Sequence, residues 1–333
     1  MQTQKLINDG NAAVDEMLTG ILAAHPDHLL RPDHAPRAVV ARHGPRPGKV
    51  ALVIGGGSGH EPTFLGYVGK GLADACAVGN VFASPPPQPV VDAALAANGG
   101  AVVLFMYGNY AGDVMNFDMA TELLEMEGIE ARTVVTTDDI ASSPNRAKRR
   151  GVAGNVFIFK AAGAAADLML PLDEVERIAR HANARTYTMG VALSSCSLPQ
   201  TRRPSFDLPV GEMEIGMGIH GEPGVRRGPL RPANDVADEI MDALLNEMKA
   251  ANGDRVAVLI NSLGATPLME LYILHARVAK HLAREGLTVH KALVGPYCTS
   301  LDMAGASITL MHLDDELTQF IDHPCDCAMF RQG

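Results

Sequence analysis

Residues 49–60 have the sequence Lys49-Val50-Ala51-Leu52-Val53-Ile54-Gly55-Gly56-Gly57-Ser58-Gly59-His60. A short apolar run that ends in glycines is typical of a buried strand in a parallel sheet. Proteins of the α/β class commonly bind ligands at the carboxyl ends of such strands. Glycine also lets a ligand approach the main chain closely. We therefore expect an α/β fold with a ligand-binding loop directly after this strand.

The loop differs from two well-known phosphate-binding loops. His60-Glu61 follows the last glycine, where a Walker A loop has Lys-Ser or Lys-Thr. His60 also replaces the third glycine of a dinucleotide-binding fingerprint. A glycine-rich turn that ends in histidine instead indicates a small polar ligand held by backbone N–H groups. The alternative is a histidine whose hydrogen bonds are satisfied by the backbone of a tight turn.

Strands and helices are expected to alternate along the whole chain, which predicts parallel or mixed sheets with covered faces. In the first part we predict helices at residues 6–24, 89–97 and 118–127, and further strands at 101–106, 131–136 and 155–160. The pattern restarts after residue 182. There we predict strands at 187–193, 255–260, 289–294 and 307–313, and helices at 233–251 and after Thr266, which caps a helix with Pro267 in its first position.

Length and composition narrow the class of protein. A chain of 333 residues exceeds the size of most single cores, so we predict two α/β domains, residues 1–184 and 185–333, each with a largely parallel or mixed sheet covered by helices. The net charge of −10 disfavours nucleic acid and anionic membranes as partners. The basic run Arg146, Lys148, Arg149 and Arg150 is interpreted as a solvated surface face.

The same features predict the compartment. No signal pattern and no membrane-spanning apolar run is evident, so the cytoplasm is expected. Five scattered cysteines fit reduced thiols better than a disulfide framework. Cys325-Asp326-Cys327 has no second cysteine or histidine pair at zinc spacing, so we expect two thiols and no metal site.

A second histidine loop lies in the other half of the chain. Residues 216–224 read Gly216-Met217-Gly218-Ile219-His220-Gly221-Glu222-Pro223-Gly224, with four glycines around one imidazole. Like His60, His220 is followed by glutamate and proline. A histidine in such a setting is expected to contact a ligand rather than fill space. The two loops together predict one site assembled from both halves of the chain.

An aspartate is expected near His60. Asp113 belongs to the segment 107–113, Tyr107-Gly108-Asn109-Tyr110-Ala111-Gly112-Asp113, which follows the predicted strand 101–106. It should therefore lie at the same sheet edge as His60. A carboxylate near an imidazole can set its tautomer or accept a proton from a substrate hydroxyl. The alternative role for Asp113 is to cap the helix that follows.

These motifs resemble the substrate-binding subunit of the dihydroxyacetone kinase family. The similarity extends from the N-terminal helix almost to the C-terminus, with the motifs in the family's order. They are Gly55–Pro62, Asn109–Asp113, Gly218–Gly224, Leu263–Pro267 and Tyr297–Met303.

The resemblance implies a role for each site residue. An imidazole nitrogen of His220 is expected to add to the carbonyl carbon of a ketose and form a hemiaminal. This covalent capture would separate ketoses from polyols such as glycerol, which have no carbonyl. His60 and Asp113 are expected beside the terminal hydroxyl of the substrate, with Asp113 as the general base. The expected substrate-binding residues are Gly57, Ser58, Gly59, Gly108 and Asn109.

The resemblance also implies a division of work between proteins. This chain is expected to bind no cofactor or metal itself. A separate helical kinase subunit would deliver the phosphoryl group, from ATP with magnesium or from a phosphoprotein of a phosphotransferase system. The family further implies a homodimer.

Gly108 departs from the family pattern. Bacterial members specific for dihydroxyacetone usually carry lysine at this position. Its loss removes a cation and opens space, which suggests either a kinase for a larger ketose such as erythrulose or a ketose sensor without catalytic activity. We favour the kinase because His60, Asp113 and His220 are all present.

Overall fold

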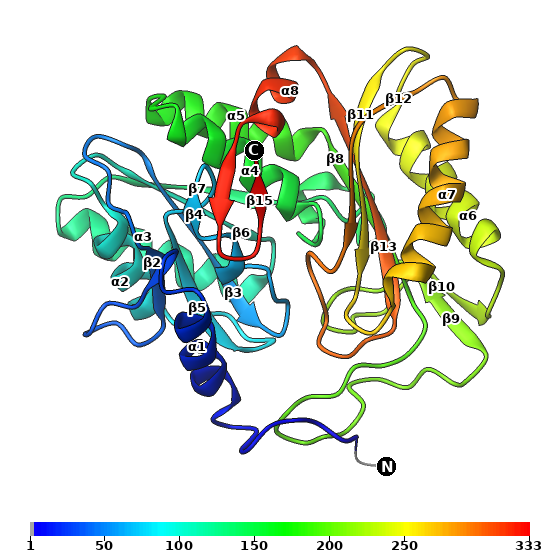
Figure 1. The fold of residues 1–333 in the computed structure, drawn as a ribbon, viewed down its shortest axis with the longest axis horizontal. Helices are drawn as coiled ribbons and strands as arrows, with labels where there is room; N and C mark the ends of the chain where they lie inside the picture. Colours follow the sequence, from blue (N-terminus) through cyan, green and yellow to red (C-terminus); the bar gives the residue numbers. More distant parts are fainter. Residues whose placement is uncertain (1–2) are drawn as a thin grey trace. The chain divides into compact units, whose positions relative to one another are not determined.

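The computed structural model describes residues 3–333, which divide into two compact units (Figure 1). Unit 1 contains the segment that ends at Leu6, together with Thr137–Val156 and Ala184–Glu316. Unit 2 contains Ile7–Thr136, Phe157–Asn183 and Leu317–Gly333. Each unit has a six-stranded sheet with helices packed on it, which confirms the predicted fold class.

The units are not the consecutive segments 1–184 and 185–333. The chain passes between the two units several times, and only the passage near residue 184 coincides with the expected boundary. The last residues of the chain group with unit 2 because strand β14 (Cys325–Cys327) pairs with β4 (Gly69–Lys70), far away in sequence. β15 (Arg331–Gln332) completes this small three-stranded sheet. Such long-range pairing leaves no trace in local periodicity.

The main sheet of unit 2 is parallel at its centre. Its strand order is β1-β2-β5-β3-β6-β7, and β5, β3, β6 and β7 run parallel, while β1 and β2 are antiparallel additions at one edge. β3 lies between β5 and β6 and is buried along almost its whole length, as its apolar run predicts. The strand bounds are β1 Leu29–Leu30, β2 Ala38–Ala41, β3 Ala51–Ser58, β5 Ala75–Val81, β6 Val103–Gly108 and β7 Ala131–Thr136.

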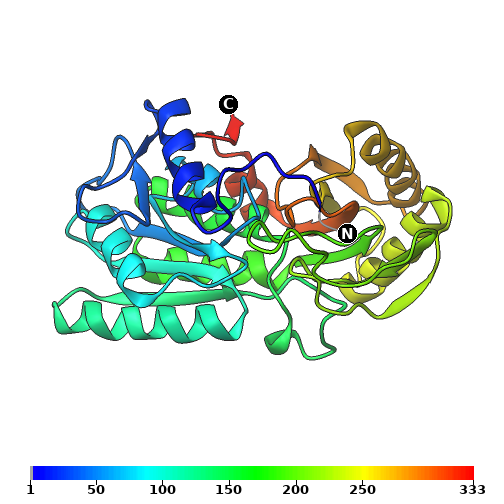
Figure 2. The same cartoon turned by 90° about the horizontal axis from the view of Figure 1, so that it is seen from below.

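Helices α2 (Pro87–Ala97) and α3 (Ala111–Met126) pack on this sheet through a buried cluster that includes Val53, Phe105 and Phe117. Figure 2 shows α3 in teal, running alongside the strands. The remaining helices of this part are α1 (Ala13–Ala24), the short η1 (Leu65–Tyr67), α4 (Asn155–Asp167), α5 (Leu172–Ala184) and α8 (Asp315–Asp322).

Two predictions in the first half are wrong. Residues 155–160, predicted as a strand, form the first turns of helix α4. The run is buried on all sides, and a fully buried helix shows no periodicity that separates it from a buried strand. The first helix begins at Ala13 and not at residue 6, and the side chain of Leu6 is fully exposed.

Unit 1 has a mixed sheet of order β10-β9-β8-β13-β11-β12, in which only β11 and β12 run parallel. Helices α6 (Ala233–Met248) and α7 (Leu268–Arg284) cover one face and share a core cluster with the sheet. A short helix, η2, spans Arg146–Lys148. The strand bounds are β8 Thr186–Ala192, β9 Glu212–Ile215, β10 Arg226–Pro229, β11 Arg255–Ser262, β12 Thr288–Gly295 and β13 Gly305–Leu313.

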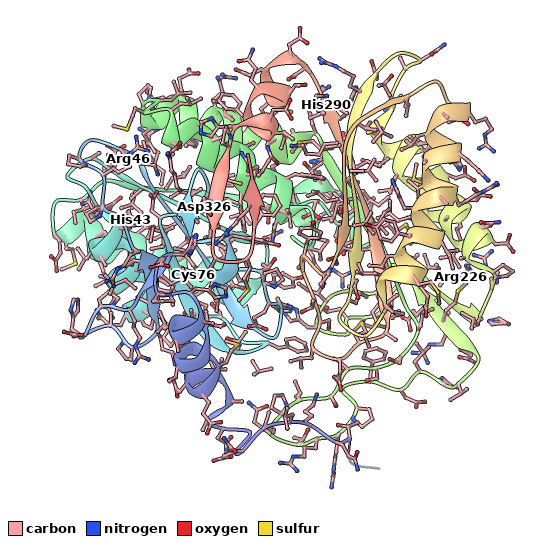
Figure 3. All side chains as sticks on the ribbon, in the orientation of Figure 1. His43, Arg46, Cys76, Arg226, His290 and Asp326 are labelled. Carbon is pink, nitrogen blue, oxygen red and sulfur yellow. The ribbon has the colours of Figure 1, made fainter. Side chains whose placement is uncertain are left out.

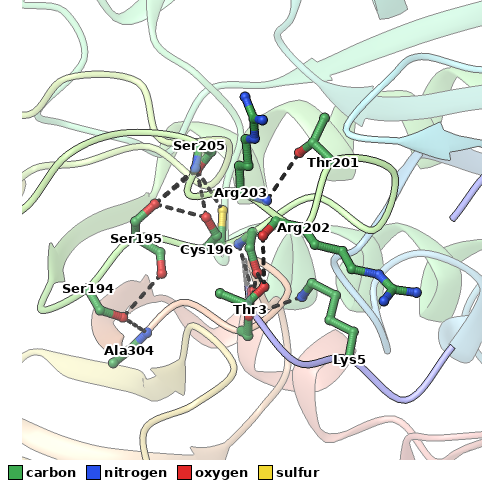
Figure 4. A network of polar contacts seen from close by, with 12 residues as sticks. Thr3, Lys5, Ser194, Ser195, Cys196, Thr201, Arg202, Arg203, Ser205 and Ala304 are labelled. Atoms are coloured by element: carbon green, nitrogen blue, oxygen red, sulfur yellow. Dashed lines mark hydrogen bonds and ion pairs between the residues drawn. The ribbon is translucent and has the colours of Figure 1, made fainter. Parts of the chain in front are cut away.

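Thr266 does not cap α7. The N-cap residue is Pro267, and the Thr266 hydroxyl instead accepts a hydrogen bond of 2.7 Å from the Gly305 N–H. The predicted cap is one residue too early, because the Thr266 hydroxyl binds the first residue of strand β13 and not the amino end of α7. A polar network holds the N-terminal segment on unit 1, and Figure 4 labels two of its members, Thr3 and Lys5. The Thr3 hydroxyl donates to the Ser197 hydroxyl at 2.7 Å, and Lys5 pairs with Asp302 at 3.0 Å.

No helix within residues 3–333 combines the length and the apolar character that crossing a bilayer requires. The five cysteines are buried thiols. The hydrogen bond with Cys325, followed by burial, raises the pKa of the Cys327 thiol.

Candidate active-site residues in the two units

In unit 2, the predicted loops lie where the order of strand addition reverses from one side of β3 to the other. The chain passes from β3 to β5 on one side, and then to β6 on the other side of β3. The segments that follow β3 and β6 therefore separate at the carboxyl edge of the sheet, which is the usual position of a ligand site in an open α/β sheet. The structure places His60 after β3 and Asp113 after β6, as expected from the sequence.

The glycines after β3 permit close packing of the main chain. A Cβ on Gly57 would lie 2.8 Å from the nitrogen of Ala83, and one on Gly56 would overlap the ring of Phe64. The Ser58 hydroxyl donates to the Gly79 carbonyl at 2.8 Å, and the Phe82 N–H donates to the Ser58 carbonyl at 3.0 Å. The loop is thus fixed by segments on both of its sides.

His60 is buried beneath this loop. Its ring stacks on Phe82, with centroids 5.0 Å apart and planes within 14°. Phe82 has a φ of 54°, an uncommon value for a residue with a side chain. The next residue, Glu61, folds back so that both carboxylate oxygens accept the Gly59 N–H at about 3 Å. Burial raises the pKa of this carboxyl group.

Asp113 lies in the first turn of α3 and is buried. The N-cap position belongs to Tyr110, so Asp113 is not the cap residue. The amino end of a 16-residue helix stabilises a carboxylate placed there. Gly108 ends β6 in a buried position, and the Asn109 N–H donates to the Thr136 carbonyl at 3.2 Å.

In unit 1, His220 lies in a loop that holds it from both sides. Glu222 folds back in the same manner as Glu61: one oxygen accepts the His220 N–H at 3.0 Å. The other oxygen lies 2.9 Å from Nδ1 of the imidazole. The Ser300 hydroxyl donates to the Ile219 carbonyl and anchors the loop on the other side. The His220 side chain remains 23% exposed, so a ligand has access to it.

The charge of Glu222 is supported by Arg150. Burial alone would raise the pKa of this carboxyl group, but the hydrogen bond and charge of His220 and the charge of Arg150, 3.8 Å away, lower it to about 2. Arg150 also binds Asp139 at 2.8 Å and the Gly216 carbonyl at 3.2 Å. Burial raises the pKa of Asp139 to about 6, against the attraction of Arg150.

This pairing decides the chemistry of the imidazole. Because Glu222 is ionised, it only accepts hydrogen bonds, so Nδ1 of His220 must carry the proton. In the neutral form of the ring the lone pair is then on Nε2, and the lone-pair nitrogen of a neutral imidazole is a nucleophile.

The interpretation of the basic run as a solvated face is wrong for three of its four residues. Arg149 is buried and binds Glu247 at 2.9 Å, and Arg150 belongs to the network of His220. The Arg146 guanidinium lies 4.8 Å from the centroid of the Tyr187 ring. Carboxylates and an aromatic ring elsewhere in unit 1 draw these arginines inward. Lys148 alone is exposed.

Sequence reasoning found His60, Asp113 and His220, but it assigned no role to Glu222, Arg150 or Phe82. The spacing His-x-Glu in a glycine loop was the available signal for Glu222. No local signal marked Phe82.

The Dak1 domain matches residues 19–329 of this chain. The chain is 50% identical over 328 residues to the dihydroxyacetone-binding subunit DhaK of PTS-dependent dihydroxyacetone kinase 2 from Listeria innocua, covering 98% of this chain and 99% of that one. It is 45% identical to a D-erythrulose kinase of Mycolicibacterium smegmatis, where it covers 99% of this chain but 57% of the relative.

Solved structures give the same family. The dihydroxyacetone kinase of C. freundii superposes with a TM-score of 0.92 at 33% identity, over 100% of this chain and 61% of that one. The dihydroxyacetone kinase operon co-activator DhaQ superposes with a TM-score of 0.89 at 33% identity, over 96% and 98% of the two chains. The resemblance found in the motifs is confirmed, and the chain belongs to the Dak1 domain family.

Proposed function

We propose that this chain is the ketose-binding subunit of a kinase for short-chain ketoses. The observation that carries the proposal is the hydrogen bond between Nδ1 of His220 and the ionised Glu222, in a partly exposed glycine loop. It makes Nε2 the lone-pair nitrogen of the neutral imidazole, which is the nucleophilic position. The names of the relatives, dihydroxyacetone-binding subunits and erythrulose kinases, support a ketose as the electrophile.

Capture begins with attack of Nε2 on the ketone carbon. A C–N bond forms, the π bond of the carbonyl breaks, and its oxygen takes up a proton to give the hydroxyl of a hemiaminal. Positive charge develops on the ring during attack, and the Glu222 carboxylate beside Nδ1 stabilises it. Nδ1 then gives up its proton to water, and water supplies the proton of the new hydroxyl, so one proton moves overall from Nδ1 to the oxygen and no net charge is gained. Glycerol offers no carbonyl and is not captured.

The terminal hydroxyl of the captured ketose is the phosphoryl acceptor. We assign Asp113 as the base that accepts its proton and His60 as a hydrogen-bond partner of the same hydroxyl. The backbone of Gly57, Ser58 and Gly59, with Gly108 and Asn109, contacts the sugar. The burial of Asp113 at a helix amino end supports a positioned carboxylate.

The phosphoryl donor is delivered by a partner. The related kinase of C. freundii, of which this chain covers about three fifths, has been solved with AMP-PNP and Mg²⁺. We propose that a separate helical subunit supplies the donor to this chain, as ATP with magnesium or as a phosphoprotein, and that the chain acts as a cytoplasmic homodimer. Phosphoryl transfer depends chiefly on positioning and charge neutralisation, which two subunits can share.

The size of the ketose depends on Gly108. Relatives named for dihydroxyacetone and relatives named for erythrulose are similarly identical to this chain, at 42–50% and 44–45%. Glycine at this buried position leaves room beside the substrate, which supports acceptance of a four-carbon ketose as well as dihydroxyacetone.

Native mass spectrometry tests the proposal. Incubation with dihydroxyacetone or erythrulose should add the mass of one whole ketose, with no loss of water, and glycerol should add nothing. His220→Ala should abolish the adduct, while His34→Ala, at an exposed histidine elsewhere, should retain it. An unmodified mass with every short ketose tried would refute covalent capture.

A ketose sensor without kinase activity is the second candidate. The close superposition with the co-activator DhaQ favours it. A sensor forms the adduct but shows no turnover with a donor-loaded partner subunit, so the turnover assay separates the two functions.

A further inference from the structure

A cavity with a volume of about 650 Å³ lies wholly within unit 2. Its size is in the range of small-molecule sites. The residues at its walls come from the segment after α1, the turn after β2, the β4 region, the end of α4 and strand β14. Figure 3 labels three of them, His43, Arg46 and Asp326.

The cavity is remote from the glycine loop of the same unit. Lys49 and Asp74 line it, and these residues directly precede β3 and β5, so the cavity lies at the amino ends of these parallel strands. The glycine loop and His60 follow the carboxyl end of β3. The strand runs from Ala51 to Ser58, a distance of roughly 23 Å at the usual rise per residue. One small molecule cannot contact both ends.

Most of the acidic groups in the cavity are already neutralised. Asp74 pairs with Lys49 and also accepts the Leu52 N–H. Asp167 pairs with Arg46 and His323.

The last of the paired carboxylates is Asp326. It binds Arg331 at 3.0 Å and His28 at 3.1 Å. Three carboxylates that line the cavity thus form ion pairs with basic side chains of the protein.

Four charged or titratable side chains remain at its walls. Within residues 3–333, the side chains of Arg42, His43, Lys70 and Asp27 have no hydrogen-bond or ion-pair partner. Two exposed permanent cations and one exposed carboxylate at these walls therefore have no ion-pair partner within the described residues. Lys70 stands opposite Asp326 in the pairing of β4 with β14, which fixes its backbone position at the rim.

We propose that this cavity binds a small phosphorylated polyol. The phosphate monoester, with a charge of about −1.5 to −2, matches two cations where a single carboxylate would match one. Arg42 offers a planar fork of N–H donors to the phosphate oxygens, and Lys70 adds a point charge. Asp27, an acceptor only, receives a hydroxyl hydrogen of the polyol.

Isothermal titration calorimetry tests this assignment with glycerol 3-phosphate as the probe. Glycerol provides the same polyol without charge, and inorganic phosphate provides the charge without the polyol. The wild-type chain should bind glycerol 3-phosphate, bind phosphate more weakly and not bind glycerol. In Arg42→Gln/Lys70→Gln the dissociation constant should rise at least tenfold.

A matched control removes the same two charges elsewhere. Arg203 and Lys280 are exposed and do not line the cavity, so Arg203→Gln/Lys280→Gln should bind as the wild type does. Thermal unfolding of each variant checks that it is folded, and the single variant Lys70→Gln provides a milder change. Absence of binding by the wild type, or equal affinity in Arg42→Gln/Lys70→Gln, would overturn the proposal. So would a loss of affinity that is the same in both double variants.

Discussion

Glu222 determines which nitrogen of His220 can react, so its charge matters more than its shape. In Glu222→Gln the amide retains the size of the side chain but cannot stabilise a positive imidazole. A hydrogen bond to a charged group contributes about 1.5–3 kcal/mol. We therefore expect the ketose adduct to weaken by at least tenfold, measured by titration with native mass spectrometry. Glu125→Gln, at an exposed position on α3, should change nothing. Equal affinity in both variants would mean that Glu222 has no role in capture.

The low pKa of Glu222 also links stability to pH. Its folded-state pKa of about 2 lies below the ordinary value of 4.5, so its stabilising contribution is present above pH 4.5 and is lost as the pH falls towards 2. Between pH 7 and pH 4 the wild type should lose about 1 kcal/mol of unfolding free energy that Glu222→Gln does not lose. Urea unfolding at the two pH values measures this difference. Parallel pH profiles would contradict it.

Gly218 is required by the same network for steric reasons. A Cβ at this position would lie 2.1 Å from Oε2 of Glu222 and 2.5 Å from a guanidinium nitrogen of Arg150. Gly218→Ala should displace the carboxylate and weaken the adduct by at least tenfold in the same mass-spectrometric titration, while the protein remains folded. Gly20→Ala is the control, because a Cβ there meets nothing within 4 Å. Normal capture by Gly218→Ala would show that the displacement is tolerated.

Among the secondary structure elements, the strands β3, β11 and β13 could be predicted from sequence because each is a largely buried apolar run bounded by turns. Helix α4 could not, since a helix buried on all sides has the same composition as a buried strand. The small sheet of β4, β14 and β15 was also missed, because its strands are short and distant in sequence.

The hairpin of β14 and β15 should stabilise unit 2 through Phe330. This side chain is buried and meets Tyr67 edge-on, with ring centroids 5.9 Å apart. Phe330→Ala should lower the free energy of unfolding by about 3 kcal/mol, measured by urea denaturation. Met329→Ala, at the neighbouring position that is 37% exposed, should cost under about 1 kcal/mol. Similar costs for the two variants would argue against a core role for the hairpin.

At the scale of the whole molecule, the sequence predicted the positions of single residues at the end of a strand better than it predicted the extent of the two units. His60 and Asp113 could be placed at one sheet edge because each follows a strand, and β3 and β6 are indeed neighbours. The discontinuous units could not be predicted, because they depend on pairing between distant segments. Arg150 was missed for the same reason: its buried partners are visible only in the folded chain.

The proposed function requires the chain both to capture a ketose and to present its hydroxyl, and the variant Asp113→Asn should separate the two tasks. The asparagine retains the shape of the side chain but cannot accept the proton. Turnover of dihydroxyacetone with a donor-loaded kinase subunit should fall by at least about 100-fold, the usual contribution of a general base. The His220 adduct should form as in the wild type.

The control variant is Asp118→Asn, at an exposed position on the same helix, which should keep both activities. Unchanged turnover in Asp113→Asn would remove the base assignment. An adduct without turnover in the wild type would instead establish a ketose sensor, because the proposed capture depends on His220 alone, whereas the proposed phosphorylation also depends on the base Asp113.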